Sequence, residues 1–131
     1  FALPEVTLGI MPGAMGTQNM PRATGTRRAM EVILTGKPFS AADGYEWGMI
    51  NKICDNDALL EEAVATAQTI ADNAPIATRQ AKKSVTMAGQ IDTHNGFAFE
   101  LEAYNRMIVS EDRLEGVLAF NEKRKAQFKG R

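Results

Sequence analysis

The chain has 131 residues, of which 15 are Lys or Arg and 16 are Asp or Glu, so its net charge is −1. This balance gives no indication of a nucleic-acid partner or of a charged membrane surface, and no apolar run approaches the ~20 residues of a membrane-spanning helix. The single cysteine, Cys54, excludes an internal disulfide framework and is typical of a reducing compartment.

The first eighteen residues alternate apolar segments with turn-forming residues. An apolar start leads into Pro4 and Glu5, a second apolar run covers residues 6–10, and a glycine-rich turn covers residues 12–16. Glu5 is the only carboxylate in this stretch and stands between two segments that are expected to be buried. Because burial disfavours the charged form of an acid, Glu5 is a candidate for proton transfer near neutral pH. The alternative is that Glu5 ends a strand and faces water.

The rest of the first half predicts short helices and one strand. A helix is expected over residues 18–23, where Pro21 can interrupt it. Thr26 precedes a second helical pattern that Gly36 ends, and Ser40 caps a third that Gly48 closes. The isoleucine-rich residues 49–54 predict a strand.

From residue 55 onward the pattern is helical only. Helices are expected from residue 56 or 57 to 71, over 75–89 with Pro75 in the first turn, around 97–108, and from 113 to about 127. Ser110, followed by two acids, is a start signal for the last of these. His94 stands among polar residues and is expected in a loop, without the spacing of a metal site.

One motif gives the sequence a family resemblance. The pattern Phe-x-x-Pro-Glu, a short apolar run, and Pro-Gly-x-Gly-Gly-Thr-Gln is similar to the second active-site segment of the enoyl-CoA hydratase/isomerase (crotonase) family. The chain departs from this pattern at Met15, where the family has glycine, which either narrows the acyl pocket or is a neutral change. The matching positions are Phe1, Pro4, Glu5, Gly9, Pro12, Gly13, Gly16, Thr17 and Gln18, followed downstream by residues 34–36, 41–48, 73–75 and 111–124.

The resemblance implies an α/β fold. Residues 1–54 would be the C-terminal part of a crotonase-type β/α spiral core, and residues 55–131 an all-helical tail for trimerisation and CoA contacts. The chain would be the C-terminal half of such a protein, because the motif starts at Phe1 and in the family this segment lies near the middle of the polypeptide; no Gly-Gly-Gly-x-Glu segment is present. It would need the missing N-terminal half and assemble as a homotrimer or hexamer. The implied location is cytoplasmic, or the mitochondrial matrix in a eukaryote.

The resemblance also assigns roles to four residues. Glu5 matches the second of two catalytic glutamates, and Gly13 matches the residue whose backbone N–H helps to hold the attacking water. Phe120 and Lys123, one helical turn apart, match residues near the nucleotide end of CoA. From the residues alone, Phe120 is equally compatible with the core and Lys123 with closing a helix dipole.

The implied function is hydration of a 2-enoyl-CoA. The substrate is an acyl-CoA thioester, and no cofactor or metal is expected besides the coenzyme A that the substrate carries. The alternatives are double-bond isomerisation, which needs only the acid at Glu5, and, less favoured, thioester hydrolysis. In a further alternative, the piece by itself is an oligomerisation module without catalysis.

Overall fold

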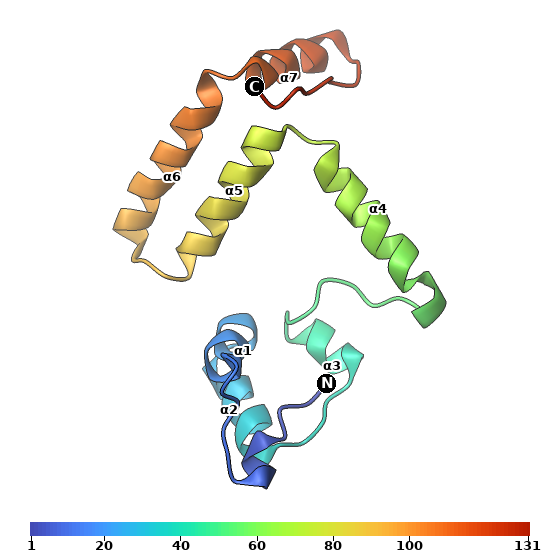
Figure 1. Ribbon diagram of the computed structural model, residues 1–131, viewed down its shortest axis with the longest axis vertical. Coiled ribbons are helices and arrows are strands. Elements are labelled where there is room, and N and C mark those ends of the chain that lie inside the picture. The colour runs from blue at the N-terminus through green and yellow to red at the C-terminus, as the bar shows by residue number, and fades with distance from the viewer. The chain divides into compact units, whose positions relative to one another are not determined.

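The computed structural model describes all residues from 1 to 131, which form two compact units, Phe1–Asp57 and Ala58–Arg131 (Figure 1). Every regular element is a helix. The first unit contains the 3₁₀ helix η1 (Glu5–Leu8) and the α-helices α1 (Gly16–Thr24), α2 (Thr26–Thr35) and α3 (Ala41–Glu46). A second 3₁₀ helix, η2 (Asn56–Ala58), precedes α4 (Leu59–Ala71), α5 (Pro75–Ala88), α6 (Thr93–Ile108) and α7 (Glu111–Glu122).

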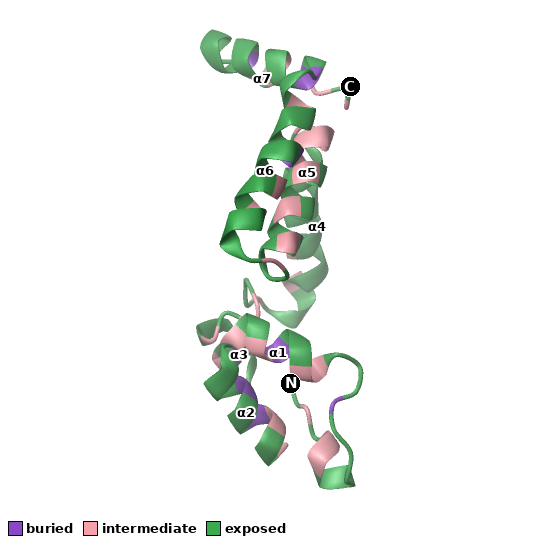
Figure 2. Cartoon of the chain, turned by 90° about the vertical axis from the view of Figure 1, so that its left-hand side faces the viewer, coloured by how far each residue is buried: buried purple, intermediate pink, exposed green.

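The core of the first unit lies between α1 and α2. Met20, Ala29 and Val32 are buried there, and Figure 2 shows buried positions on both helices. Five partly buried residues pack against them: Leu3, Ile33, Phe39, Trp47 and Met49. The expected helix over 18–23 is confirmed, and Pro21 lies inside α1 without ending it.

A row of aromatic rings joins the start of the chain to α3. The Phe1 and Phe39 rings stack with centroids 5.5 Å apart, and Phe39 is 5.1 Å from Trp47. The Arg28 guanidinium lies 4.6 Å above the Trp47 ring, within the range of a cation–π interaction. The Phe39 N–H also donates to the Phe1 carbonyl at 2.9 Å. These contacts hold the segment before Glu5 in place.

The expected strand over residues 49–54 is wrong. These residues are irregular, and the Met49 N–H donates to the Gly44 carbonyl at 2.8 Å instead of joining a ladder. A strand needs a second strand to pair with its backbone groups, and residues 1–131 contain none. The β content of the expected α/β fold is therefore absent from this chain.

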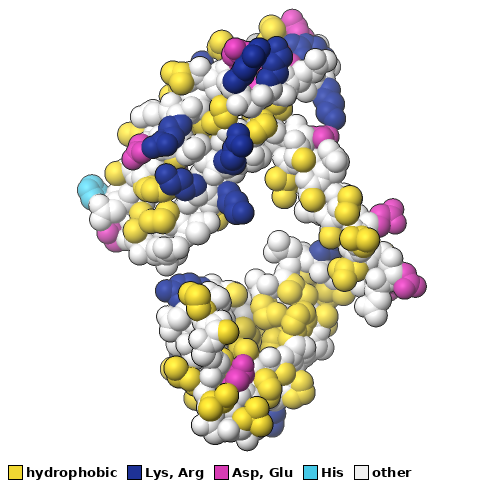
Figure 3. Space-filling view, viewed as in Figure 1, with side chains coloured by type: hydrophobic (Ala, Val, Ile, Leu, Met, Phe, Trp, Pro, Cys, Tyr) yellow, Lys and Arg dark blue, Asp and Glu magenta, His cyan; other side chains and the backbone are white.

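The second unit is built on the pair α5 and α6, which lie side by side (Figure 1). Pro75 occupies the first turn of α5, as expected, and Asp92 caps α6 by accepting the Asn95 N–H at 3.1 Å. This cap places His94 in the first turn of α6, so its expected loop position is wrong. Only Ala103 is buried on this helix pair, and many large apolar side chains remain exposed (Figure 3).

The residues that follow helix α7 fold back against it. Ser110 caps α7 by accepting the Arg113 N–H at 3.1 Å, as the sequence predicts. The helix ends at Glu122, not near residue 127, because Lys123 adopts a left-handed conformation with φ of 54°. Residues 124–131, the C-terminal segment, then return along α7 (Figure 1). Buried Asp112 accepts the backbone N–H groups of Lys129 at 2.6 Å and Gly130 at 2.8 Å.

Glu115 also holds the C-terminal segment. Its carboxylate binds both terminal nitrogens of Arg124 at 2.6 and 2.9 Å and accepts the Gln127 N–H at 2.8 Å. The Arg124 hydrogen bonds, and then the Gln127 N–H, hold the pKa of Glu115 at about 2, below its ordinary value of 4.5.

We predict that the C-terminal segment loosens only in strong acid. A lowered carboxyl pKa means that ionised Glu115 stabilises the segment fully above pH 4.5 and loses this effect as the pH falls through about 2. The Gln127 amide signal, followed by NMR, should shift with a midpoint near 2. Glu115→Gln should abolish that transition, whereas a wild-type midpoint near 4.5 would contradict the interpretation.

Met15 is a backbone exception at the start of α1. Its φ is 66°, in the left-handed region where a Cβ crowds the following carbonyl and glycine is favoured. Its side chain is 62% exposed, so little packing within the chain offsets this cost.

We predict that Met15→Gly raises the free energy of unfolding by ~1 kcal/mol, because glycine adopts this conformation without strain. Urea denaturation of the protein measures the change. Met30→Gly is the matched control, since Met30 is similarly exposed at 57% but lies inside α2. That control should lower stability by ~1 kcal/mol, and a loss of stability in both variants would refute the assignment of strain to Met15.

Candidate active site

Glu5 is the first residue of η1, in a turn that its neighbours hold firmly. The Pro4 carbonyl accepts two hydrogen bonds from Thr7, one from the backbone N–H at 2.9 Å and one from Oγ1 at 2.8 Å. The Ile10 N–H donates to the Glu5 carbonyl at 3.2 Å. The Glu5 backbone is therefore fixed on both sides by local bonds.

The Glu5 carboxylate has an oxygen without a partner. Oε2 is buried, and no donor in the chain reaches it. A buried polar atom in this state is costly unless a hydrogen bond compensates for it. The arrangement therefore suits a donor from outside the chain, such as a water molecule or a group of a substrate. The strand-end position considered for Glu5 is wrong, because Glu5 begins a 3₁₀ helix.

The turn over residues 13–15 offers a free backbone donor. Pro12 is buried and Gly13 is exposed, and the Gly13 N–H finds no acceptor within the chain. A Cβ on Gly13 would meet only the Met11 carbonyl, at 3.8 Å. On Gly16 it would lie 2.7 Å from the Pro12 Cβ. Gly16 thus fixes the turn by close packing, while Gly13 leaves its backbone open to a ligand.

The four expected site residues divide between the units. Glu5 and Gly13 lie in the first unit, and Phe120 and Lys123 in the second. Phe120 is 83% exposed, so its alternative position in the core is wrong. Lys123 lies just beyond α7, and its N–H donates to the Phe120 carbonyl at 3.2 Å. Lys123 is therefore the residue that follows α7 and is not part of it.

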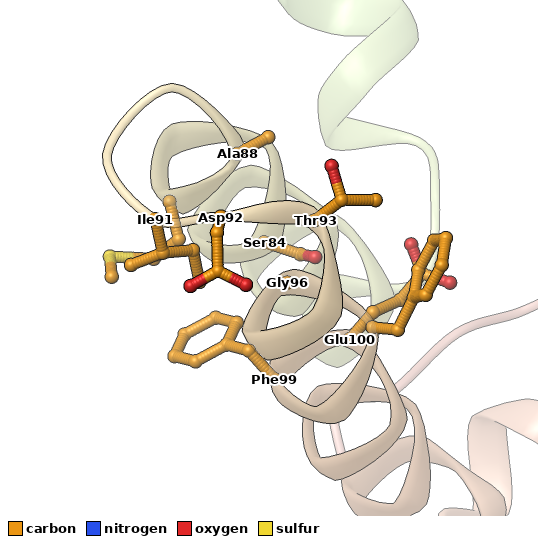
Figure 4. A pocket seen from close by; sticks show the side chains of 10 residues that line it. Ser84, Ala88, Ile91, Asp92, Thr93, Gly96, Phe99 and Glu100 are labelled. Carbon is orange, nitrogen blue, oxygen red and sulfur yellow. The ribbon is translucent and has the colours of Figure 1, made fainter.

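A cavity of about 170 Å³ between α5 and α6 lacks comparable chemistry. Figure 4 shows its lining, in which Asp92 and Glu100 lie apart. Asp92 already caps α6, and the backbone N–H of Asn95 holds the pKa of Asp92 below its ordinary value. The structure contains no cluster of three or more His, Cys, Asp or Glu side chains suited to a metal ion. None of its helices has the length and apolarity needed to cross a membrane.

Sequence reasoning missed two residues beside Glu5. Thr7 holds the Pro4 carbonyl, and Gly36 approaches the same turn closely. The sequence indicated Gly36 as a helix end and as part of a segment that matches the family, but its approach to the Glu5 turn is a contact between distant parts of the chain.

Comparisons with known proteins agree on one family. The family described as Enoyl-CoA hydratase/isomerase matches residues 1–131. The mitochondrial enoyl-CoA hydratase of Pongo abelii is 43% identical over 129 residues, which cover 98% of this chain and 44% of the relative. The 2,3-dehydroadipyl-CoA hydratase of Escherichia coli is 37% identical over 131 residues, 100% of this chain and 51% of the relative.

Solved structures give the same result. The crystal structure of enoyl-CoA hydratase from Bacillus anthracis is 44% identical, with a TM-score of 0.96 over 99% of this chain and 50% of that one. One from Mycobacterium tuberculosis has a TM-score of 0.94 at 30% identity, covering 100% and 52%. The chain spans about half the length of the curated relatives it matches.

Proposed function

Because the chain belongs to the enoyl-CoA hydratase/isomerase family, we propose that its protein adds water to the double bond of a 2-enoyl-CoA. The observation that carries the proposal is the buried, unpartnered Oε2 of Glu5, in the unit that also presents the free Gly13 N–H. An acid with an unpartnered oxygen and a backbone N–H without an acceptor are groups that a hydration reaction uses.

In the proposed reaction, Glu5 exchanges the proton at the alpha carbon while water adds to the beta carbon. The Gly13 N–H donates to the water and holds it in position. Negative charge develops on the thioester oxygen, where backbone N–H donors of an oxyanion hole would stabilise it. Addition of water requires no cofactor besides the coenzyme A that the substrate carries.

We propose further that the chain corresponds to the C-terminal half of its relatives. The support is that residues 1–18 match the second active-site segment, whereas no Gly-Gly-Gly-x-Glu segment occurs among residues 1–131. The oxyanion donors and the other glutamate would then lie in the remaining half. Residues 1–54 would complete the spiral core, and residues 55–131 would form the helical tail.

Exposed side chains support two further parts of the proposal. Phe120, at 83% exposure, and the neighbouring Lys123 would contact the nucleotide end of CoA. Three apolar side chains, Phe97 and Leu101 on α6 and Leu114 on α7, are each more than half exposed. Such surface favours burial against other chains, and we propose a homotrimer or hexamer.

Double-bond isomerisation is the second candidate. It requires a single acid that moves a proton between two carbons of the same substrate, and Glu5 is the one carboxylate in the segment. A second glutamate facing Glu5 in the complete protein favours hydration, and its absence favours isomerisation.

We predict that Glu5→Gln in the complete protein lowers kcat with crotonyl-CoA by ~10²-fold or more, the usual effect of losing a general acid–base group. Glutamine keeps the shape of the side chain but cannot exchange the proton. Binding of the CoA ester, measured by calorimetry, should change little. Glu46→Gln is the control, since Glu46 lies at the end of α3. Turnover by Glu5→Gln near the wild-type rate would exclude this role.

We also predict that residues 1–131 alone show no hydratase activity. Loss of one oxyanion donor typically lowers kcat by ~10²–10³-fold, and this chain would lack both donors and one glutamate. Turnover, measured as the decrease in the absorbance of crotonyl-CoA, should be restored when the other half of the protein is expressed separately and added. Turnover by residues 1–131 alone would mean that the site is built from other residues, and no recovery on complementation would favour an oligomerisation module.

A further inference from the structure

The end of α2 touches the turn that carries Glu5. Gly36 follows the last residue of α2 with φ of 63°, and its N–H donates to the Val32 carbonyl at 3.0 Å. This left-handed conformation explains a glycine as the end of the helix. It does not explain why Gly36 also lies directly against another segment, the turn over residues 4–7.

No side chain fits at Gly36 without moving the Glu5 turn. A Cβ on Gly36 would lie 2.9 Å from Thr7 Cγ2, 3.4 Å from Val6 Cγ2 and 3.5 Å from Pro4 Cα. Other glycines with positive φ in the same unit lack such neighbours. Gly25 has nothing within 4 Å, and Gly48 would meet only the Ala23 carbonyl, at 3.8 Å.

Thr7 cannot turn its methyl group away from Gly36. Its Oγ1 donates to the Pro4 carbonyl at 2.8 Å, and rotation of the side chain would break this bond. A β-branched side chain is also restricted in rotation about its first torsion. A Cβ at position 36 would therefore shift the backbone of residues 4–7 by some tenths of an ångström, and the Glu5 carboxylate with it.

We propose that Gly36 and Thr7 are positioning residues for the Glu5 carboxylate. The end of α2 packs against the turn over residues 4–7 and so limits where this turn, and the carboxylate with it, can lie. The inference rests on the proposed function, because it assigns the position of Glu5 to proton transfer. Neither residue touches the substrate in this proposal. A misplacement of ~1 Å in a catalytic group can lower the rate by ~10²-fold, so a smaller shift should have a smaller effect on kcat.

The test compares two glycine substitutions in the complete protein. Gly36→Ala should lower kcat with crotonyl-CoA by ~10-fold, with KM changed less than about twofold, because the carboxylate moves while the CoA contacts stay. Gly48→Ala is the matched control, since it places alanine at a φ of 75° without crowding the turn. It should keep the wild-type kcat.

Two further variants separate crowding from strain. Gly36→Asn keeps the crowding Cβ, but asparagine tolerates the left-handed conformation, so kcat should fall although the variant is folded. Adding Thr7→Ser to Gly36→Ala removes the crowding methyl and retains the hydroxyl bond to Pro4, so kcat should recover in part. Equal kcat in Gly36→Ala and Gly48→Ala, or no recovery in the double variant, would overturn the proposal.

A structural measurement separates this proposal from the proposed function. If wild-type and Glu5→Gln proteins turn over enoyl-CoA equally, the function fails, and hydrogen exchange still tests the positioning. The amides of Thr7, Gly9 and Ile10 donate within the turn. They should exchange ~10-fold faster in Gly36→Ala than in Gly48→Ala if the turn is displaced. Equal exchange in the two variants would overturn the positioning role.

Discussion

The first unit depends on a close contact between the end of α2, at Gly36, and the turn over residues 4–7. The contact exists because Gly36 has no side chain, and its neighbours Val6 and Thr7 fill the space that a side chain would take. Helix α2 is anchored by Ala29 and Val32, which are buried in the core. The position of the candidate acid is thereby linked to the packing of α1 against α2, although Glu5 lies outside that core.

The second unit is stabilised differently, by carboxylates that hold backbone groups. Asp92 caps α6, while Asp112 and Glu115 hold the C-terminal segment against α7. Carboxylates that accept backbone N–H groups can replace part of the stabilisation that a large core would supply. The scarcity of buried apolar side chains in this unit is consistent with such a role. Its exposed apolar residues then remain available for contacts with other chains.

Local signals predicted the elements that local bonds stabilise. Pro75, Ser110 and Gly36 begin or end helices through their own backbone geometry and their nearest neighbours, so the sequence was sufficient there. The strand predicted over residues 49–54 does not form, because a strand needs a second segment to pair with its backbone groups. The last helix was predicted to reach about residue 127, but the left-handed conformation of Lys123 ends it, and no residue type in the sequence signals that conformation there. The motif predicted Glu5 and Gly13 as site residues, but the isolation of Oε2 and the close approach of Gly36 to the turn depend on contacts that only the folded chain defines.

The free Gly13 N–H belongs to the main chain, and this has an evolutionary consequence. A donor of this kind is kept through every replacement except proline, provided that the turn retains its shape. The acid at position 5 has no such protection, since one base change in the codon can remove it. If the proposed roles hold, a lineage that replaces Glu5 changes its proton chemistry and still inherits the same backbone donor, so related proteins can diverge in reaction without rebuilding the loop.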